Sequence, residues 1–201
     1  MERVDIIKNC ILSGKRYEDI IGQIYLSMPT FAFENSYEKQ YEIMQKISNR
    51  LDIPYYNIQV TGSAKIGVSL HKKTAFSAAS SDLDVAIIDR DLFVKISEKI
   101  HIETNGLTRG DLFPKYKDKN TGKQVDKHED YKRNLLKGIL MDNCMPLGDT
   151  KRSWVKFFED LSSEYRKDFK SISGAIYLSQ YYFVNKQKSI IQYVNGFEVI
   201  K

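Results

Sequence analysis

Two carboxylates separated by a single residue stand in the most chemically suggestive stretch of the chain. Asp82 and Asp84 belong to the run Ser-Ser-Asp-Leu-Asp-Val-Ala-Ile-Ile at 80–88, whose apolar and β-branched residues predict a strand over 83–88. Residues i and i+2 of a strand point to the same face, so the two carboxylates are expected to project side by side. Like charges that close raise each other's pKa unless a cation lies between them. Mg²⁺ (or Mn²⁺) takes carboxylate oxygens and leaves positions for substrate phosphates. The pattern therefore predicts a metal site, against the plainer alternative of a strand end with two solvated aspartates.

A glycine-containing turn precedes this strand. Residues 60–67 read Val-Thr-Gly-Ser-Ala-Lys-Ile-Gly, after an apolar stretch that predicts a first strand over 55–61. Gly62 has no Cβ, so backbone N–H groups can approach a phosphate there. Ser63 adds a hydroxyl donor and Lys65 a positive charge. Together with Ser81, which adjoins the acidic pair, these residues are the candidate nucleotide-binding set.

A Gly-Ser turn followed by a strand that carries Asp-x-Asp resembles the nucleotidyltransferases of the DNA polymerase β superfamily. The resemblance covers about 60–88 and is weak elsewhere. It implies an α+β fold, a small mixed sheet flanked by helices. It also implies that Gly62 and Ser63 hold the phosphates of a nucleoside triphosphate (NTP) and that Asp82 and Asp84 bind the catalytic Mg²⁺. The implied reaction moves a nucleoside monophosphate to a hydroxyl on RNA, a protein or a small molecule. The resemblance and the small size also suggest a bacterial toxin–antitoxin or phage-defence setting.

The chain departs from this family in two places. Twenty positions separate Gly62 from Asp82, which is long for the family, and the excess at 71–80 reads as a loop. His71, Lys72 and Lys73 in it would meet a triphosphate or a nucleic-acid backbone, or simply form a solvated basic loop.

The second departure concerns a third acid, which active members of the family generally carry on a neighbouring strand to complete a two-metal site. Glu198, in Phe-Glu-Val, has the right local context and is the best candidate catalytic residue beside Asp82 and Asp84. Asp111 lies in a loop-like stretch, and Asp142 lies at an expected helix end.

Two classes of function therefore stay open. The retained acidic pair favours an active Mg²⁺-dependent nucleotidyltransferase. The uncertain third acid favours a fold that has lost catalysis and binds nucleotide or RNA as a regulatory module.

Positive charge is concentrated between residues 115 and 137. The chain has a net charge of +5, and this segment alone contains eight Lys or Arg residues against four acids. Localised positive charge suggests a polyanionic partner, although a solvated lysine-rich loop is the common alternative. The candidate nucleic-acid ligands are Lys115, Lys117, Lys119, Lys123 and Lys127. The aromatic residues of an expected helix over 175–194 offer a base-stacking surface, or simply core.

Length and composition suggest one domain with helical extensions. The 201 residues divide into a helical part (1–51), a motif-bearing core (52–100) and a basic loop with C-terminal helices (101–201). A mean hydropathy of −0.43 and the lack of a long apolar run argue against a membrane-spanning helix. The charged N-terminus does not resemble a signal peptide, and the two cysteines, Cys10 and Cys144, are expected to be reduced thiols in a cytoplasmic protein.

The expected helices follow apolar residues at helical spacing. Two short ones lie within 2–26, broken near Ser13-Gly14. The others are expected over 34–51 and 64–70, from a cap at Asp91 through 99, over 129–140 and 153–165, and over 175–194 with Ser173 as the N-cap.

Overall fold

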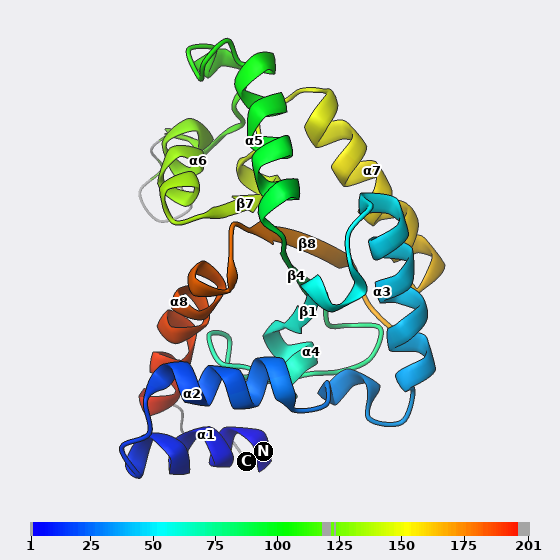
Figure 1. The fold of residues 1–201 in the computed structure, drawn as a ribbon, viewed down its shortest axis with the longest axis vertical. Helices are drawn as coiled ribbons and strands as arrows, with labels where there is room; N and C mark the ends of the chain where they lie inside the picture. Colours follow the sequence, from blue (N-terminus) through cyan, green and yellow to red (C-terminus); the bar gives the residue numbers. More distant parts are fainter. Residues whose placement is uncertain (1, 118–121, 123, 197–201) are drawn as a thin grey trace.

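The computed structural model describes residues 2–117, 122 and 124–196, and shows an α+β fold (Figure 1). Its central sheet has the order β1-β4-β8-β7. The strands are β1 (Ile58–Thr61), β4 (Leu83–Ile88), β8 (Ile172–Tyr177) and β7 (Ile139–Met141). β4 runs parallel to β8, whereas β1 pairs with β4 and β7 pairs with β8 in antiparallel fashion. The sheet is therefore mixed, and the acidic strand lies inside it rather than at its edge.

Helices cover both faces of this sheet (Figure 1). On one face, α3 (Tyr37–Leu51), α5 (Arg90–Glu103), α6 (Lys127–Leu136) and α7 (Asp149–Glu164) pack on Leu83, Val85 and Ile87 of β4. On the other, α1 (Glu2–Leu12), α2 (Tyr17–Ile21) with its π-helical continuation Gly22–Ser27, and α8 (Gln180–Ile191) pack around Ala86 and Tyr177. Because side chains alternate along a strand, Asp84 shares the second face with Ala86.

The remaining elements are short. The helix α4 (Gly62–Ile66) follows β1 directly, and β2 (Val68–Ser69) pairs with β3 (Thr74–Ala75) in a small hairpin. A second hairpin pairs β5 (Lys115–Lys117) with β6 (Gln124–Asp126). One-turn helices lie at Phe31–Phe33, Tyr55–Asn57, Gly110–Leu112, Asp142–Cys144 and Gln192–Gly196.

The largest difference from the sequence-based expectation lies at 172–177. The expected helix over 175–194, with Ser173 as its N-cap, is instead strand β8 followed by α8. Ile172, Gly174 and Ile176 alternate with Ser173 and Ala175, and this period of two fits a strand with one face on the core. The predicted helix is therefore wrong in its first turns, and the error conceals a strand next to the acidic pair.

Smaller differences concern caps and boundaries. The side chain of Asp89, not Asp91, caps α5 by accepting a hydrogen bond from the backbone N–H of Leu92 at 2.8 Å. The predicted strand over 55–61 begins only at Ile58, and the segment 103–127 contains the hairpin β5–β6. The strand predicted over 83–88 is confirmed at both ends.

Within the described part of the chain, no helix is long and apolar enough to cross a membrane. Cys10 and Cys144 are free thiols.

Candidate functional site

The acidic pair and the Gly-Ser turn meet in one pocket of about 480 Å³. Gly62, Ser63, Asp82 and Asp84 all line it, and so does Ser81. We call this cavity the acidic pocket. The strand order brings its parts together: β1 delivers the turn to one side of β4, and Thr61 is in register with Asp84. Five of the six residues predicted from the motif and its surroundings thus surround a single cavity.

Strand β8 and the residue that precedes it deliver two serines to the opposite side of the acidic pair. The hydroxyl of Ser171 donates to Oδ1 of Asp82 at 2.8 Å, and that of Ser173 donates to Oδ1 of Asp84 at 3.2 Å. Ser173 is in register with Asp84, so the two side chains leave neighbouring strands on the same face. Neither serine was predicted to be part of the site, because the segment that follows them was expected to be a helix with Ser173 as its N-cap. The period-two alternation of 172–176 is the signal that could have found them.

The electrostatic surroundings of Asp84 disfavour a bare negative charge. Desolvation by burial raises the pKa of this carboxyl, and the charge of Asp82 raises it further, while the hydrogen bond from Ser173 and the nearby Lys72 act in the opposite direction. The surrounding residues reduce the hydration of Asp84, but its side chain is still exposed to the acidic pocket. A cation placed between the two carboxylates would relieve both contributions that raise the pKa.

Gly62 lies so close to Asp84 that no other residue fits without displacement. Its φ is +63°, and a Cβ there would stand 2.6 Å from Oδ2 of Asp84. The turn therefore needs glycine twice, for its backbone conformation and for the space beside the carboxylate. This close approach holds the phosphate-binding candidate and the metal-binding candidate in contact.

Lys65 is not brought to the acidic pocket. Its ammonium donates to the backbone oxygen of Met28 at 2.6 Å, and the residue is only 4% exposed. Burial, with the nearby Arg3 guanidinium, lowers the pKa of Lys65 to about 8. Arg3 donates to the backbone oxygens of Lys65 and Pro29, so both basic residues tie α4 to the N-terminal segment.

Other basic side chains line the acidic pocket instead. Lys72 comes from the turn between β2 and β3, Lys170 from the approach to β8, and Lys186 from α8. His71 and Tyr193 also line it, and their rings meet edge to face at a centroid distance of 5.6 Å. The prediction that the 71–80 loop faces the site therefore agrees with the positions of His71 and Lys72.

The aromatic residues of the C-terminal part divide between core and pocket. Tyr177 and Phe183 are buried and pack edge to face. Tyr182 packs against Gly138, and Tyr181 is exposed. Of the described aromatic residues in this part, only Tyr193, which is 55% exposed, lines the acidic pocket.

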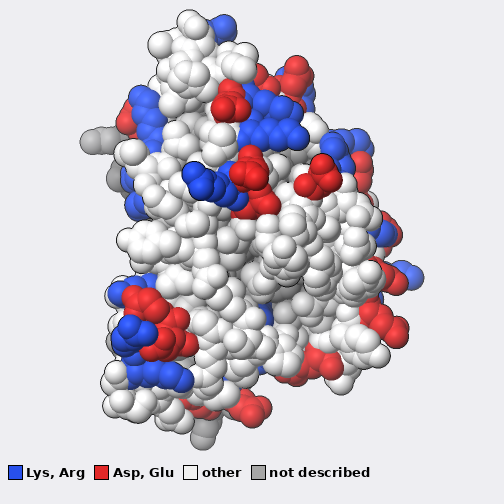
Figure 2. Space-filling view, in the orientation of Figure 1, with Lys and Arg blue, Asp and Glu red and all other residues white. Residues whose placement is uncertain are grey.

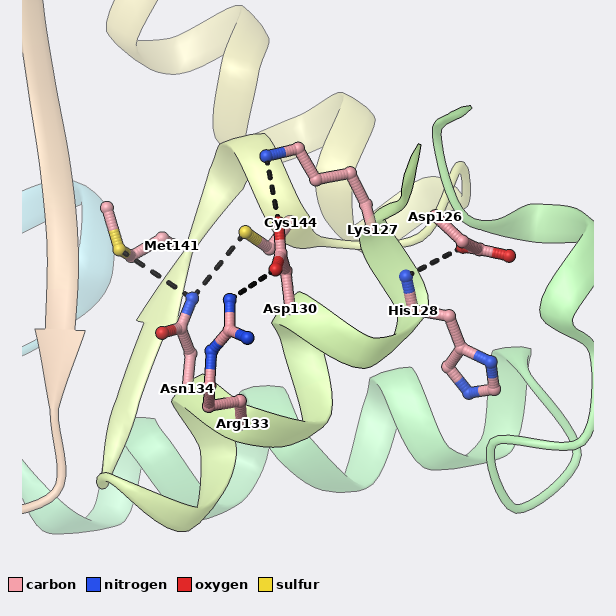
Figure 3. A network of polar contacts seen from close by, with 8 residues as sticks. All are labelled: Asp126, Lys127, His128, Asp130, Arg133, Asn134, Met141 and Cys144. Atoms are coloured by element: carbon pink, nitrogen blue, oxygen red, sulfur yellow. Dashed lines mark hydrogen bonds and ion pairs between the residues drawn. The ribbon is translucent and has the colours of Figure 1, made fainter. Parts of the chain in front are cut away.

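The basic segment 115–137 is partly neutralised by its own acids, as Figure 3 shows. Asp130 pairs with Lys127 at 3.2 Å and with Arg133 at 2.5 Å, and Lys132 pairs with Glu129 at 3.0 Å. The ammonium of Lys127 also lies 4.4 Å from the ring centre of Tyr116. Lys115 and Lys117 are exposed on β5, whereas Lys119 and Lys123 lie outside the described residues. On the face drawn in Figure 2, basic and acidic side chains are interspersed rather than gathered into one basic surface.

The candidates for a third acid have different outcomes. Glu198 lies outside the described residues. Asp111 is exposed and pairs with Arg109 at 2.7 Å, and it does not line the acidic pocket. Asp142 lies beyond the end of β7, in a different cavity that also contains Ser171 and Ser173. Among the described residues there is no cluster of three or more His, Cys, Asp or Glu side chains that could hold a metal ion.

The donor set fits one Mg²⁺ ion better than two. Magnesium is commonly held by one or two carboxylates together with substrate phosphates and water, and Asp82 and Asp84 supply that number. Gly62 and Ser63 line the same pocket as the carboxylates, so phosphates held there would reach an ion bound by Asp82 and Asp84.

Comparisons with known proteins return no relationship: no family model, no curated protein and no solved structure matches the chain. The assignment of a function therefore depends on the geometry of the acidic pocket.

Proposed function

We propose that the protein is a Mg²⁺-dependent nucleotidyltransferase, which moves a nucleoside monophosphate from an NTP to a hydroxyl group. The observation that carries this proposal is the contact between Gly62 and Asp84 at the base of a pocket that also contains Ser63 and Asp82. This contact supports the proposal, because a triphosphate held by the turn and a cation held by the carboxylates would then lie side by side.

The roles of the residues follow from their chemistry. Asp82 and Asp84 would hold the ion, which supplies charge neutralisation for the triphosphate when it is bound. Ser63 donates to a phosphate oxygen, and Gly62 lets its backbone approach. Lys72, Lys170 and Lys186 at the pocket wall offset the remaining phosphate charge.

Ser171 and Ser173 position the carboxylates. Each hydroxyl occupies one Oδ1 atom, which limits the rotation of the carboxylate. A preoriented pair loses less conformational freedom when the cation and the nucleotide bind.

The test is transfer of label. The protein is incubated with each α-³²P-labelled NTP, Mg²⁺ or Mn²⁺, and separate acceptors: total RNA, proteins and small molecules. We expect label in one acceptor class with the wild type, and none with Asp82→Asn or Asp84→Asn. Binding of NTP in the presence of Mg²⁺ without transfer to any acceptor would contradict the transferase.

A second candidate function has an observation of its own. β8 presents Ser171 and Ser173 where a neighbouring strand would carry the third acid, so the described site lacks the second metal's ligand. This favours a nucleotide-binding module that senses NTP without turning it over. Both candidates require the acidic pocket, and they differ only in whether a bond is made.

A further inference from the structure

A second cavity lies on the far side of the two serines. It measures about 220 Å³ and opens at the edge of β8, where β7 ends at Met141, so that the first residues of β8 pair with β4 but have no strand partner on the β7 side. We call it the β8-edge pocket. Ser162 of α7 replaces the missing strand there, because its hydroxyl accepts from the backbone N–H of Ile172 at 2.8 Å.

Two serines connect this cavity with the acidic pair. Ser171 and Ser173 line the β8-edge pocket, and the same hydroxyls donate to Asp82 and Asp84. A group bound in the β8-edge pocket would therefore contact the two serines that position the carboxylates.

The strand order sets the direction of approach. In the order β1-β4-β8, the Gly62–Ser63 turn stands on one side of the acidic strand and the β8-edge pocket on the other. Phosphoryl-group transfer needs the attacking oxygen and the leaving oxygen roughly in line. With the pyrophosphate end at the turn, an acceptor must approach from the side of β8.

The lining of the β8-edge pocket selects by charge. Asp142 and Glu159 contribute carboxylates, Trp154 and Phe158 contribute aromatic surface, and the described lining contains no lysine or arginine. Two lysines stand beside the lining: Lys151 donates to the backbone oxygen of Met145 at 3.2 Å and its charge interacts with Asp142, while Lys156 pairs with Asp160 at 2.6 Å. Such a lining repels a polyanion and attracts an ammonium group.

We propose that the β8-edge pocket is the acceptor site and that the acceptor is a small alcohol that carries an amine. This inference rests on the proposed function. In the reaction, the acceptor oxygen forms a bond to the α-phosphorus of the NTP, and the bond from that phosphorus to the bridging oxygen breaks. The electron pair leaves on pyrophosphate, and the proton of the acceptor hydroxyl is released to water.

Trp154 allows a test that does not depend on turnover, because it is the chain's single tryptophan and lines the pocket. Its fluorescence is titrated with glucosamine, ethanolamine and choline, and with N-acetylglucosamine as the neutral analogue of the first. We expect a saturable change with at least one of the amines, and binding about tenfold weaker after N-acetylation, the loss of roughly one charge contact.

Paired variants localise the signal, since Trp154 also borders a cavity near Arg50 and Lys95. Glu159→Gln is expected to weaken amine binding about tenfold. The control Glu42→Gln, at an exposed position of α3 outside the pocket lining, should leave it unchanged. No fluorescence response to any of the three amines, or an equal response in Glu159→Gln and the wild type, would overturn the proposal.

Calorimetry with NTP and Mg²⁺ separates this failure from failure of the proposed function. Intact NTP binding together with transfer of label to RNA or protein would overturn the acceptor assignment alone. If the wild type does not bind NTP at all, the proposed transferase function itself is wrong.

Discussion

Ser173 stands directly beside Asp84 across two parallel strands, and its hydroxyl donates to the carboxylate at 3.2 Å. A serine at this position does what a third acid cannot: it stabilises the charged form of Asp84 without adding negative charge. The neighbouring strand thus supports the acidic pair by hydrogen bonding and adds no third carboxylate to it.

Exchange of Ser173 separates the two candidate functions. Ser173→Asp would place a third carboxylate in register with Asp84, where a second cation could bind. If the wild type is a nucleotide-binding module, this variant should gain Mg²⁺-dependent release of pyrophosphate. If the wild type is already a transferase, we expect Ser173→Ala to lower transfer about tenfold, the cost of roughly one hydrogen bond to a charged group. Pyrophosphate release is the measurement for both variants, and identical rates in all three proteins would contradict the role given to this strand.

Removal of either carboxylate should strongly weaken binding of the metal-bound nucleotide. Asp82→Asn and Asp84→Asn each leave the cation with one charged ligand, and we expect affinity for NTP with Mg²⁺ to fall by about a hundredfold, equivalent to roughly 3 kcal/mol. Asp91→Asn, an exposed residue at the start of α5, is the matched control. Calorimetry should also show that EDTA removes most of the difference between the wild type and Asp84→Asn. A persistent difference would mean that the carboxylate acts without a cation.

Gly62→Ala tests the contact at the base of the acidic pocket. A Cβ would meet Oδ2 of Asp84 at 2.6 Å, so binding of NTP with Mg²⁺ should weaken at least about tenfold. Gly14→Ala is the control, because Gly14 has a similar φ of +73° but nothing within 4 Å of a built Cβ. Both variants should lose about 1–2 kcal/mol of stability from the left-handed conformation, measured by urea unfolding. If both also bind nucleotide like the wild type, the turn has no part in the site.

The lowered pKa of Lys65 should make the free energy of unfolding depend measurably on pH. Its pKa of about 8 in the folded chain lies below the ordinary value of 10.5, so between these values the unfolded chain binds more protons than the folded one. The free energy of unfolding therefore rises with pH over this window, by up to about 3 kcal/mol. Urea unfolding of the wild type and of Lys65→Met from pH 7 to pH 9.5 isolates this contribution, because other titrating groups are common to both proteins. A stability difference that stays constant over that range would show that Lys65 keeps its proton in the folded state.

Short-range patterns predicted much of the acidic pocket. The strand over 83–88 and the turn at Gly62–Ser63 follow from alternation and from glycine, and both are local properties of the sequence. Lys65 was misleading, since its charge suggested a phosphate although its side chain reaches Met28. The contact joins two residues that are distant in the sequence, and no local pattern between 28 and 65 predicts it.

The limits of the prediction are clearest where aromatic residues dominate. Tyr37, Tyr41, Met44 and Ile47 stand at helical spacing along α3, yet both tyrosines are exposed, whereas Ile43 is buried together with Met44 and Ile47. Tyrosine tolerates either environment, so spacing alone does not determine which face is covered. In the same way, the apolar residues after Ile172 matched a helical spacing, and β8 was hidden because pairing with β4 decides its conformation.

The pairing of the two aspartates with serines from β8 also constrains how the molecule folds. Ser171 lies 89 positions beyond Asp82, and Ser173 lies the same distance beyond Asp84. Contacts between such distant positions require closure of a long loop before they contribute stability, and pairings of this kind form slowly. The carboxylates therefore acquire their orientation only when residues 171–177 add to the sheet, and a chain that has formed only its local hairpins and helices would bind no nucleotide. Recovery of nucleotide binding during refolding thus reports the docking of β8 rather than the formation of the motif itself.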